Sequence, residues 1–306
     1  MILVAGDMRN SGTAIAWEAL RNGASALDAV EEGVRAVEAN AEDHSVGLGG
    51  YPNMLGEVEL DAGIMDGRTR HSGAVGSLRG FAHPISVARA VMTRLPHVLL
   101  VGEGAACFAA AIGAERAMLL TEATRDAWYA WCHRCGLEAG ALSQDAEALI
   151  KAVWHSEDPQ RAGGTTVYLA QDSAGDIAIA ASTSGWAWKH PGRLGDTPIA
   201  GAGFYADNRF GAAACTGTGE LAIRTGLARS TVLHMEMGMS VQDAVREGLR
   251  DIADLPKRHG GVTLYAIDTH SDHCVGTTRA DRSDAEYYVA VGDSLAPVPR
   301  RRSAYL

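Results

Sequence analysis

The stretch Gly163–Gly185, GGTTVYLAQDSAGDIAIAASTSG, consists of two short apolar runs on either side of a polar turn at Ser173–Asp176. Apolar runs of this length, bounded by glycine, serine and aspartate, predict two β-strands joined as a hairpin. Two glycines and two threonines begin the first run, and STSG ends the second. Glycine has the least restricted backbone of all residues, and here two glycines directly precede two hydroxyl-bearing residues at the start of an apolar strand.

Thr165 directly follows Gly164 and is the candidate nucleophile of this stretch. A threonine hydroxyl is a weak nucleophile until a base removes its proton. The α-amine of the same residue, which titrates near pH 8, can be that base if the threonine begins a chain. A mid-chain threonine reaches this state only when the preceding bond breaks, and Gly164 permits the strained backbone that an N-to-O acyl shift requires. Taken alone, such a segment is more often an ordinary loop before a strand.

The composition is that of a globular protein with an acidic balance. The chain has 306 residues, 47% of them apolar and 21% charged, with a formal net charge of −10 and a pI near 5.5. This length fits one large domain or two small ones, and the charge argues against nucleic acid or an anionic membrane as a partner. Neither a secretory signal nor a membrane-spanning run is expected.

Five scattered cysteines favour a reduced, cytoplasmic protein. Cys132 and Cys135 form a CHRC pair, which lacks the second pair that zinc would need and the preceding strand of a redox site. We therefore expect two ordinary thiols on a helix, and no metal site.

Helices and strands are expected in blocks rather than in strict alternation, which favours stacked sheets with helices outside them. The weakly periodic segment Gly136–Gly164 is expected to be a surface connection. Helices are predicted over Thr13–Asn22, after Ser25, from Pro84, from Glu220 and over Val241–Ile252. Strands are predicted on both sides of the Asp66-Gly67 turn, as a buried HVLLVG strand from His97, at Ile199–Tyr205, and over GVTLYAID and EYYVAVG.

Several long motifs occur in a fixed order along the chain: ALDAVEEGVRAVE, SVGLGGYPNMLGEVELDAGIMDG, STSG, GRLGD, IAGAGFYADN and AACTGTGE. In these motifs the sequence resembles the glycosylasparaginase and plant-type asparaginase family of N-terminal nucleophile hydrolases. The resemblance covers most of the chain and implies an α+β fold, a four-layer αββα sandwich, as a single domain over residues 1–306. It also implies autocatalytic cleavage into residues 1–164 and 165–306, and a homodimer of cleaved protomers. No cofactor is required by this chemistry, although the family sometimes holds a structural sodium ion.

The resemblance also implies a role for each site residue. The cleavage site is Gly164–Thr165, with Thr165 as the nucleophile and Thr183 as a second threonine beside it. Arg193 and Asp196 match the residues that hold the substrate's α-carboxylate and α-ammonium. Thr216 and Gly217 match the oxyanion hole, and Ser45 matches a serine that lines the site. These residue types suit the roles, because an arginine fork matches a carboxylate and a hydroxyl with an N–H can stabilise an oxyanion. Taken singly, Arg193 and Asp196 also fit a surface ion pair, and Thr216-Gly217 a strand end.

Three positions depart from the family pattern. Gly163-Gly164 stands where glycosylasparaginases have His-Asp, which is closer to plant-type asparaginases and isoaspartyl peptidases. Thr166 and Val167 replace an aliphatic residue and a glycine, so Thr166 is a minor alternative nucleophile. Asp7 matches a tryptophan of glycosylasparaginases; it is either a solvated or helix-start acid, or a pocket residue that favours a positive or donor-rich substrate group.

We expect an amidohydrolase that cleaves the side-chain amide of a small-molecule asparagine or aspartyl derivative through an acyl-enzyme on Thr165. Asp7, Thr166 and Val167 motivate one alternative, a related amidase with a non-aspartyl substrate. A second alternative is an uncleaved relative that serves in binding or assembly. The substrate's leaving group is not specified by these motifs.

Overall fold

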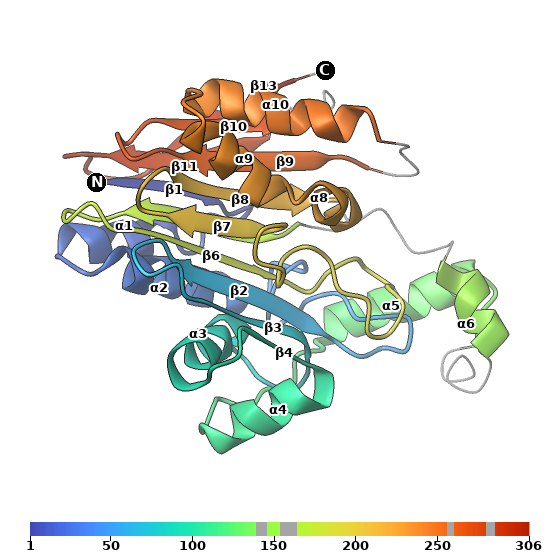
Figure 1. Cartoon of the computed structure of the whole chain (residues 1–306). Coiled ribbons are helices and arrows are strands. Elements are labelled where there is room, and N and C mark those ends of the chain that lie inside the picture. Colours follow the sequence, from blue (N-terminus) through green and yellow to red (C-terminus); the bar gives the residue numbers. More distant parts are fainter. Residues whose placement is uncertain (139–145, 154–163, 256–259, 280–284, 306) are drawn as a thin grey trace.

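The computed structural model describes residues 1–138, 146–153, 164–255, 260–279 and 285–305, and Gly163 lies outside these ranges. The chain forms a mixed α/β structure with two sheets (Figure 1). The larger sheet has the order β12-β11-β1-β5-β6-β2-β3-β4 and the smaller sheet the order β13-β10-β9-β8-β7. The strands are β1 (Ile2–Gly6), β2 (Leu60–Asp66), β3 (Ser72–Leu78), β4 (Leu99–Val101), β5 (Thr166–Gln171), β6 (Ile177–Thr183), β7 (Phe204–Asp207), β8 (Gly211–Gly217), β9 (Val262–Ile267), β10 (His273–Thr277), β11 (Glu286–Val291), β12 (Val298–Arg301) and β13 (Ser303–Ala304). The helices are α1 (Thr13–Arg21), α2 (Ala26–Glu38), α3 (Pro84–Arg94), α4 (Gly102–Ala111), α5 (Glu122–Arg134), α6 (Ala146–Ala152), α8 (Gly219–Thr225), α9 (Leu227–Glu236) and α10 (Val241–Ala253).

The predicted hairpin is confirmed and occupies the middle of the larger sheet. β5 and β6 pair antiparallel from Thr166 opposite Ser182 to Gln171 opposite Ile177. β1 pairs with the outer edge of β5, and β2 pairs with the outer edge of β6. The ends of the hairpin strands therefore lie between strands from the first part of the chain.

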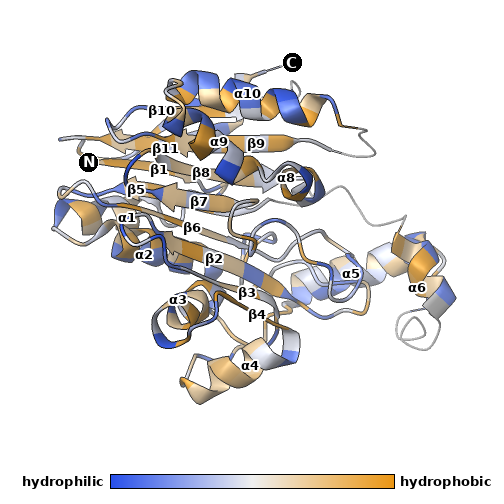
Figure 2. Cartoon of the chain, viewed as in Figure 1, coloured by the Kyte–Doolittle hydropathy of each residue, from blue (hydrophilic) through white to orange (hydrophobic). Residues whose placement is uncertain are grey.

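Three buried apolar clusters hold the sheets and helices together. The first cluster joins one face of the larger sheet to α1, α2 and α3, and the second fills the space between the two sheets. The third joins the smaller sheet to α8, α9 and α10. Figure 2 shows the matching distribution, with apolar strands inside and helices that have one polar face.

The structure confirms the residues that were predicted to begin or end helices. Ser25 caps α2 by accepting a hydrogen bond from the Asp28 amide, and Gly23 follows α1 with a φ of +88°. Pro84 begins α3. None of the helices in the described ranges is long and apolar enough to cross a membrane.

Three predictions were wrong in detail. The HVLLVG strand is the three-residue β4 at the edge of the larger sheet, and the side chain of Val101 is 49% exposed. The strand expected at Ile199–Tyr205 begins only at Phe204, because tight turns occupy the preceding glycine-rich residues. The connection Gly136–Gly164 contains α6, which packs with α5 in a small separate cluster, and the rest of it, at 139–145 and 154–163, lies outside the described residues.

Candidate active site

Strand alternation decides which hydroxyl of the Thr165-Thr166 pair faces the space between the sheets. In β5, Val167 and Leu169 belong to the core between the sheets, whereas Tyr168 belongs to the core beneath the helices. Because successive side chains point to opposite faces, Thr165 falls on the inter-sheet side and Thr166 on the helix side. The Thr166 hydroxyl is buried and has no hydrogen-bond partner within the described part of the chain.

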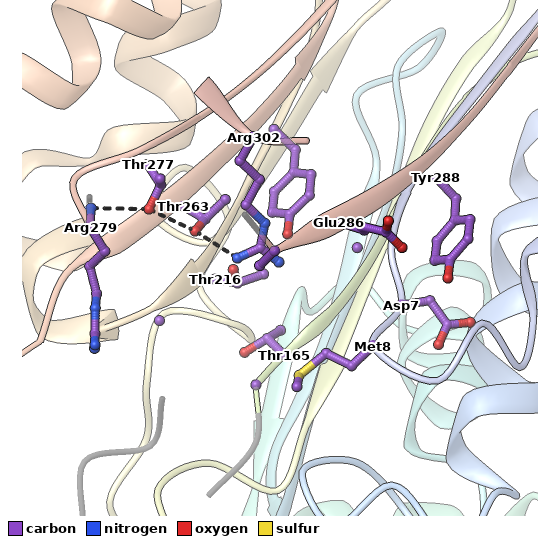
Figure 3. A pocket seen from close by; sticks show the side chains of 15 residues that line it. Asp7, Met8, Thr165, Thr216, Thr263, Thr277, Arg279, Glu286, Tyr288 and Arg302 are labelled. Carbon is purple, nitrogen blue, oxygen red and sulfur yellow. Dashed lines mark hydrogen bonds between the residues drawn. The ribbon is translucent and has the colours of Figure 1, made fainter. Parts of the chain in front are cut away.

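Thr165 lies where two cavities adjoin. Both cavities are lined by Gly164, Thr165 and Gly217. One cavity also contains Thr183, Arg193 and Asp196. The other has a volume of about 250 Å³ and also contains Thr216, Thr263, Thr277, Arg279, Arg302, Asp7 and Met8, among others. Figure 3 shows Thr165 at the start of β5 below Thr216, with Arg302 above both.

The sheets therefore gather residues that are far apart in the sequence. Thr216 is the last residue but one of β8 and lies on the same inter-sheet face as Ala212 and Ala214. Thr216 is the register partner of Thr263 on β9. Gly217 has a φ of +112°, a backbone conformation that a residue with a Cβ adopts only under strain. The Thr216-Gly217 pair is therefore a strand end, and it also lines the cavity beside Thr165.

Arg193 is fixed by two partners. Its Nε donates to Glu220 Oε1 at 2.9 Å, and its Nη2 donates to both carboxylate oxygens at 2.8 Å. The guanidinium also lies over the ring of Trp186, with 4.6 Å between Cζ and the ring centroid. The remaining nitrogen, Nη1, lies close to Gly195, where an added Cβ would be 3.1 Å from it. Arg193 pairs with Glu220 rather than with Asp196, and its Nη1 takes no part in the hydrogen bonds to Glu220.

Asp196 is a buried carboxyl group in the same cavity. Burial raises its pKa to about 7, and the charges of Glu220 and Asp61 act in the same direction, whereas Arg193 opposes them. Its Oδ2 has no hydrogen-bond partner among the described residues. Such a group is suited to a cationic ligand, because an ammonium would supply the missing donor and favour the ionised form.

Thr183 and Ser45 form one side of this region. The Thr183 hydroxyl accepts a hydrogen bond from the Gly185 amide at 3.0 Å and donates to the Ser45 carbonyl at 3.4 Å. The Ser45 hydroxyl instead donates to Asp43 at 2.5 Å. Ser45 is not among the described residues that line either cavity, so it meets the site through its backbone.

Asp7 is not solvated, contrary to one of the two interpretations of its sequence position. Its side chain is 2% exposed and accepts hydrogen bonds from the amides of Arg9 and Gly12 and from the Tyr168 hydroxyl. The bond from Gly12 is that of a helix-start acid, since Gly12 immediately precedes α1. Asp7 also lines the larger cavity (Figure 3).

The sequence did not single out a cluster of buried charges below Arg193. Lys189 Nζ donates to the Glu59 carbonyl at 3.2 Å and lies 3.9 Å from an Asp61 oxygen. Burial lowers the pKa of Lys189 and raises that of Asp61. Glu59 in turn receives hydrogen bonds from Arg79 and Ser77. The only sequence signal was the presence of charges inside the apolar motifs VELDAG and WKHPGR.

In the described ranges, no group of three or more histidine, cysteine, aspartate or glutamate side chains is placed to hold a metal ion. Cys132 lies on α5 in an apolar cluster, and burial raises the pKa of its thiol. This is the environment of an ordinary buried thiol.

A sequence model of a family described as asparaginase matches residues 9–285. The chain belongs to this asparaginase family. It is similar to N(4)-(Beta-N-acetylglucosaminyl)-L-asparaginase of Elizabethkingia miricola, with 41% identity over 80% of this chain and 67% of the relative. It is also similar to two proteins named isoaspartyl peptidase/L-asparaginase: that of Bos taurus, with 39% identity over 82% of this chain and 76% of the relative, and that of Homo sapiens, with 39% identity over 82% and 77%.

Membership of the asparaginase family makes this protein a hydrolase. The names of its relatives concern the amide bonds of asparagine and aspartyl derivatives, which is the reaction class expected from the sequence.

Proposed function

We propose that the protein hydrolyses the β-amide of an asparagine or aspartyl derivative, with Thr165 as the nucleophile. The observation that carries this proposal is the position of Thr165 at the junction of the two cavities. On one side Arg193 and Asp196 offer a cation and an anion, the complement of an amino acid's α-carboxylate and α-ammonium. On the other side Thr216 and Gly217 offer two donors for the carbonyl oxygen.

In the proposed reaction the Thr165 hydroxyl attacks the β-carbonyl carbon while the α-amine of Thr165 takes its proton. The Thr216 hydroxyl and the Gly217 N–H stabilise the oxyanion. The α-amine then protonates the leaving nitrogen as the C–N bond breaks, which leaves an ester on Thr165. Water attacks the ester while the same amine takes its proton, and the amine then returns this proton to Thr165 Oγ as the C–O bond breaks, which releases aspartate and restores the Thr165 hydroxyl.

The α-amine exists only after the Gly164–Thr165 bond is cleaved, so we also propose that the chain matures into residues 1–164 and 165–306. We assign the whole chain to one domain of the four-layer αββα type, which the order of the three apolar cores supports. A homodimer of cleaved protomers is proposed from the family resemblance alone. Ser45 and Thr183 are assigned to the support of the nucleophile, and Asp7 to the support of the loop beside it.

The test compares Thr165→Ala, Thr165→Ser and the neighbouring control Thr166→Val, with asparagine and β-aspartyl dipeptides as substrates. We expect Thr165→Ala to abolish both chain cleavage and turnover, and Thr165→Ser to keep part of both. Thr166→Val removes a buried hydroxyl without a partner in the described structure, so it should keep both near the wild-type level. A Thr165→Ala protein with wild-type turnover would overturn the proposed mechanism. Turnover of unrelated amides, with none of aspartyl compounds, would favour the non-aspartyl alternative.

A further inference from the structure

The larger cavity offers more space beside Thr165 than ammonia needs as a leaving group. Its volume is about 250 Å³, whereas one water molecule in the liquid occupies roughly 30 Å³. The proposed α-carboxylate and α-ammonium anchors lie in the other cavity, whose volume is only about 20 Å³, so most of an aspartyl substrate, its leaving group included, extends into this one. A leaving group of several heavy atoms therefore fits here.

Arg302 enters this cavity from the point where the chain crosses from one sheet to the other. β12 pairs with β11 in the larger sheet, and β13 pairs with β10 in the smaller sheet. Arg302 is the single residue between these strands. Its side chain consequently lies between the sheet ends and points toward Thr216 (Figure 3).

The guanidinium of Arg302 is held by neutral groups. Nη1 donates to the Thr263 hydroxyl at 3.3 Å, and the Tyr265 ring centroid lies 5.9 Å from Cζ. Within the described ranges, Nε is buried without a hydrogen-bond partner and no carboxylate forms an ion pair with this side chain. This contrasts with Arg193, whose fork is already engaged by Glu220. A half-buried arginine that has a buried Nε and no carboxylate partner among the described residues is suited to bind an anion.

Arg302 is connected to the proposed oxyanion hole through Thr263. Thr263, its hydrogen-bond partner, is directly opposite Thr216 across the β8–β9 pair, and such partners have Cβ atoms roughly 5 Å apart. The carboxylate carbon of a leaving α-amino acid is two bonds from its nitrogen, so this carboxylate stays close to the bond that breaks, on the side of Thr216 and Thr263. Glu286 also lines the cavity, between Arg302 and Tyr288 in the view of Figure 3, and the described residues form no ion pair between Arg302 and Glu286.

We propose that Arg302 binds a carboxylate of the leaving group, and that the enzyme thereby selects β-aspartyl amides of amino acids over β-aspartyl amides with a neutral leaving group. This inference rests on the proposed function. It makes Arg302 a specificity-determining residue of this chain, supplied by its C-terminal segment rather than by the motifs that surround Thr165.

The experiment measures kcat/KM for β-aspartyl-glycine, β-aspartyl-glycinamide and asparagine in the wild type, Arg302→Gln and Arg300→Gln. Arg300 is an exposed arginine of β12 that does not line the cavity, so it controls for the loss of one positive charge. We expect the wild type to prefer β-aspartyl-glycine over its glycinamide analogue by roughly 10- to 100-fold, the range of one charge-assisted hydrogen bond. Arg302→Gln should remove this preference, and Arg300→Gln should keep it. Thermal unfolding of each variant verifies that the fold is intact.

Two results separate this inference from the proposed function. A wild type that hydrolyses asparagine but treats the acid and its amide alike would overturn the role of Arg302 and leave the proposed function standing. The same holds for an Arg302→Gln variant that keeps the wild-type preference. Failure of the wild type on all three substrates would overturn the proposed function and this inference together.

Discussion

At the scale of single residues, Asp196 combines a functional position with an unfavourable environment. Its native pKa of about 7 is well above the roughly 3.9 of an exposed aspartate. Between these two pH values the unfolded chain releases a proton that the native protein retains. The contribution of Asp196 to stability therefore falls as pH rises from about 4 to about 7, and it does not recover at higher pH.

Asp196→Asn cannot ionise, so it should stabilise the protein relative to wild type, and more at pH 8 than at pH 5. A difference of about 3 kcal/mol between the two pH values is expected, since the effect grows over the roughly two pH units from pH 5 to the native pKa at 1.36 kcal/mol each. The same variant should lose most activity, because the asparagine side chain cannot neutralise an ammonium. Chemical denaturation at both pH values measures the stability change, and an equal effect at pH 5 and pH 8 would contradict the assigned pKa.

Motifs in the sequence identified residues that line the site, but they did not identify the contacts that these residues make with distant parts of the chain. The GRLGD motif pointed to Arg193 and Asp196, and both line the cavity beside Thr165. Glu220 was present in AACTGTGE, yet its pairing with Arg193 joins a loop to α8 across the site. Local patterns contain no information on such a contact, since it depends on how the two sheets stack.

At the scale of elements, the start of α8 is shaped to admit Asp196. A Cβ added at Gly219 would lie 2.5 Å from Asp196 Oδ1 and 2.6 Å from its backbone nitrogen. Gly219→Ala should therefore displace the carboxyl group, raise KM for an aspartyl substrate about tenfold or more, and change kcat less. Gly104→Ala in α4 is the matched control, since a Cβ there meets no atom within 4 Å. Equal KM values in the two variants would show that the position of Asp196 does not depend on Gly219.

The hairpin and most helices followed from local signals, whereas the edge strand did not. β5 and β6 are buried over their whole length, and their apolar runs predicted strands correctly. HVLLVG is equally apolar, but β4 pairs only with β3 over Ala74–Gly76 and ends the sheet. Whether an apolar run lies in the middle or at the edge of a sheet depends on non-local pairing, and that is absent from its own residues.

At the scale of the whole molecule, strand order determines what cleavage at Gly164–Thr165 does to the protein. The larger sheet runs β11-β1-β5-β6-β2, so the two strands of the hairpin, from the second fragment, lie between β1 and β2 of the first. β1 is in turn held between β5 and β11. Each proposed fragment therefore supplies strands that the other needs for its backbone hydrogen bonds and for the inter-sheet core.

We accordingly expect the cleaved protein to remain one folded unit. Intact-mass measurement under denaturing conditions should give two chains, residues 1–164 and 165–306, while native size-exclusion chromatography should give a single peak containing both. Thr165→Ala should elute at the same volume as one uncleaved chain, because the fold does not need the cut. Fragments that separate without denaturant would contradict the interleaved strand order, and a wild type that stays whole after long incubation would contradict cleavage. A cut after Thr165 instead of before it would transfer the nucleophile to Thr166, whose hydroxyl faces the helices and not the cavity.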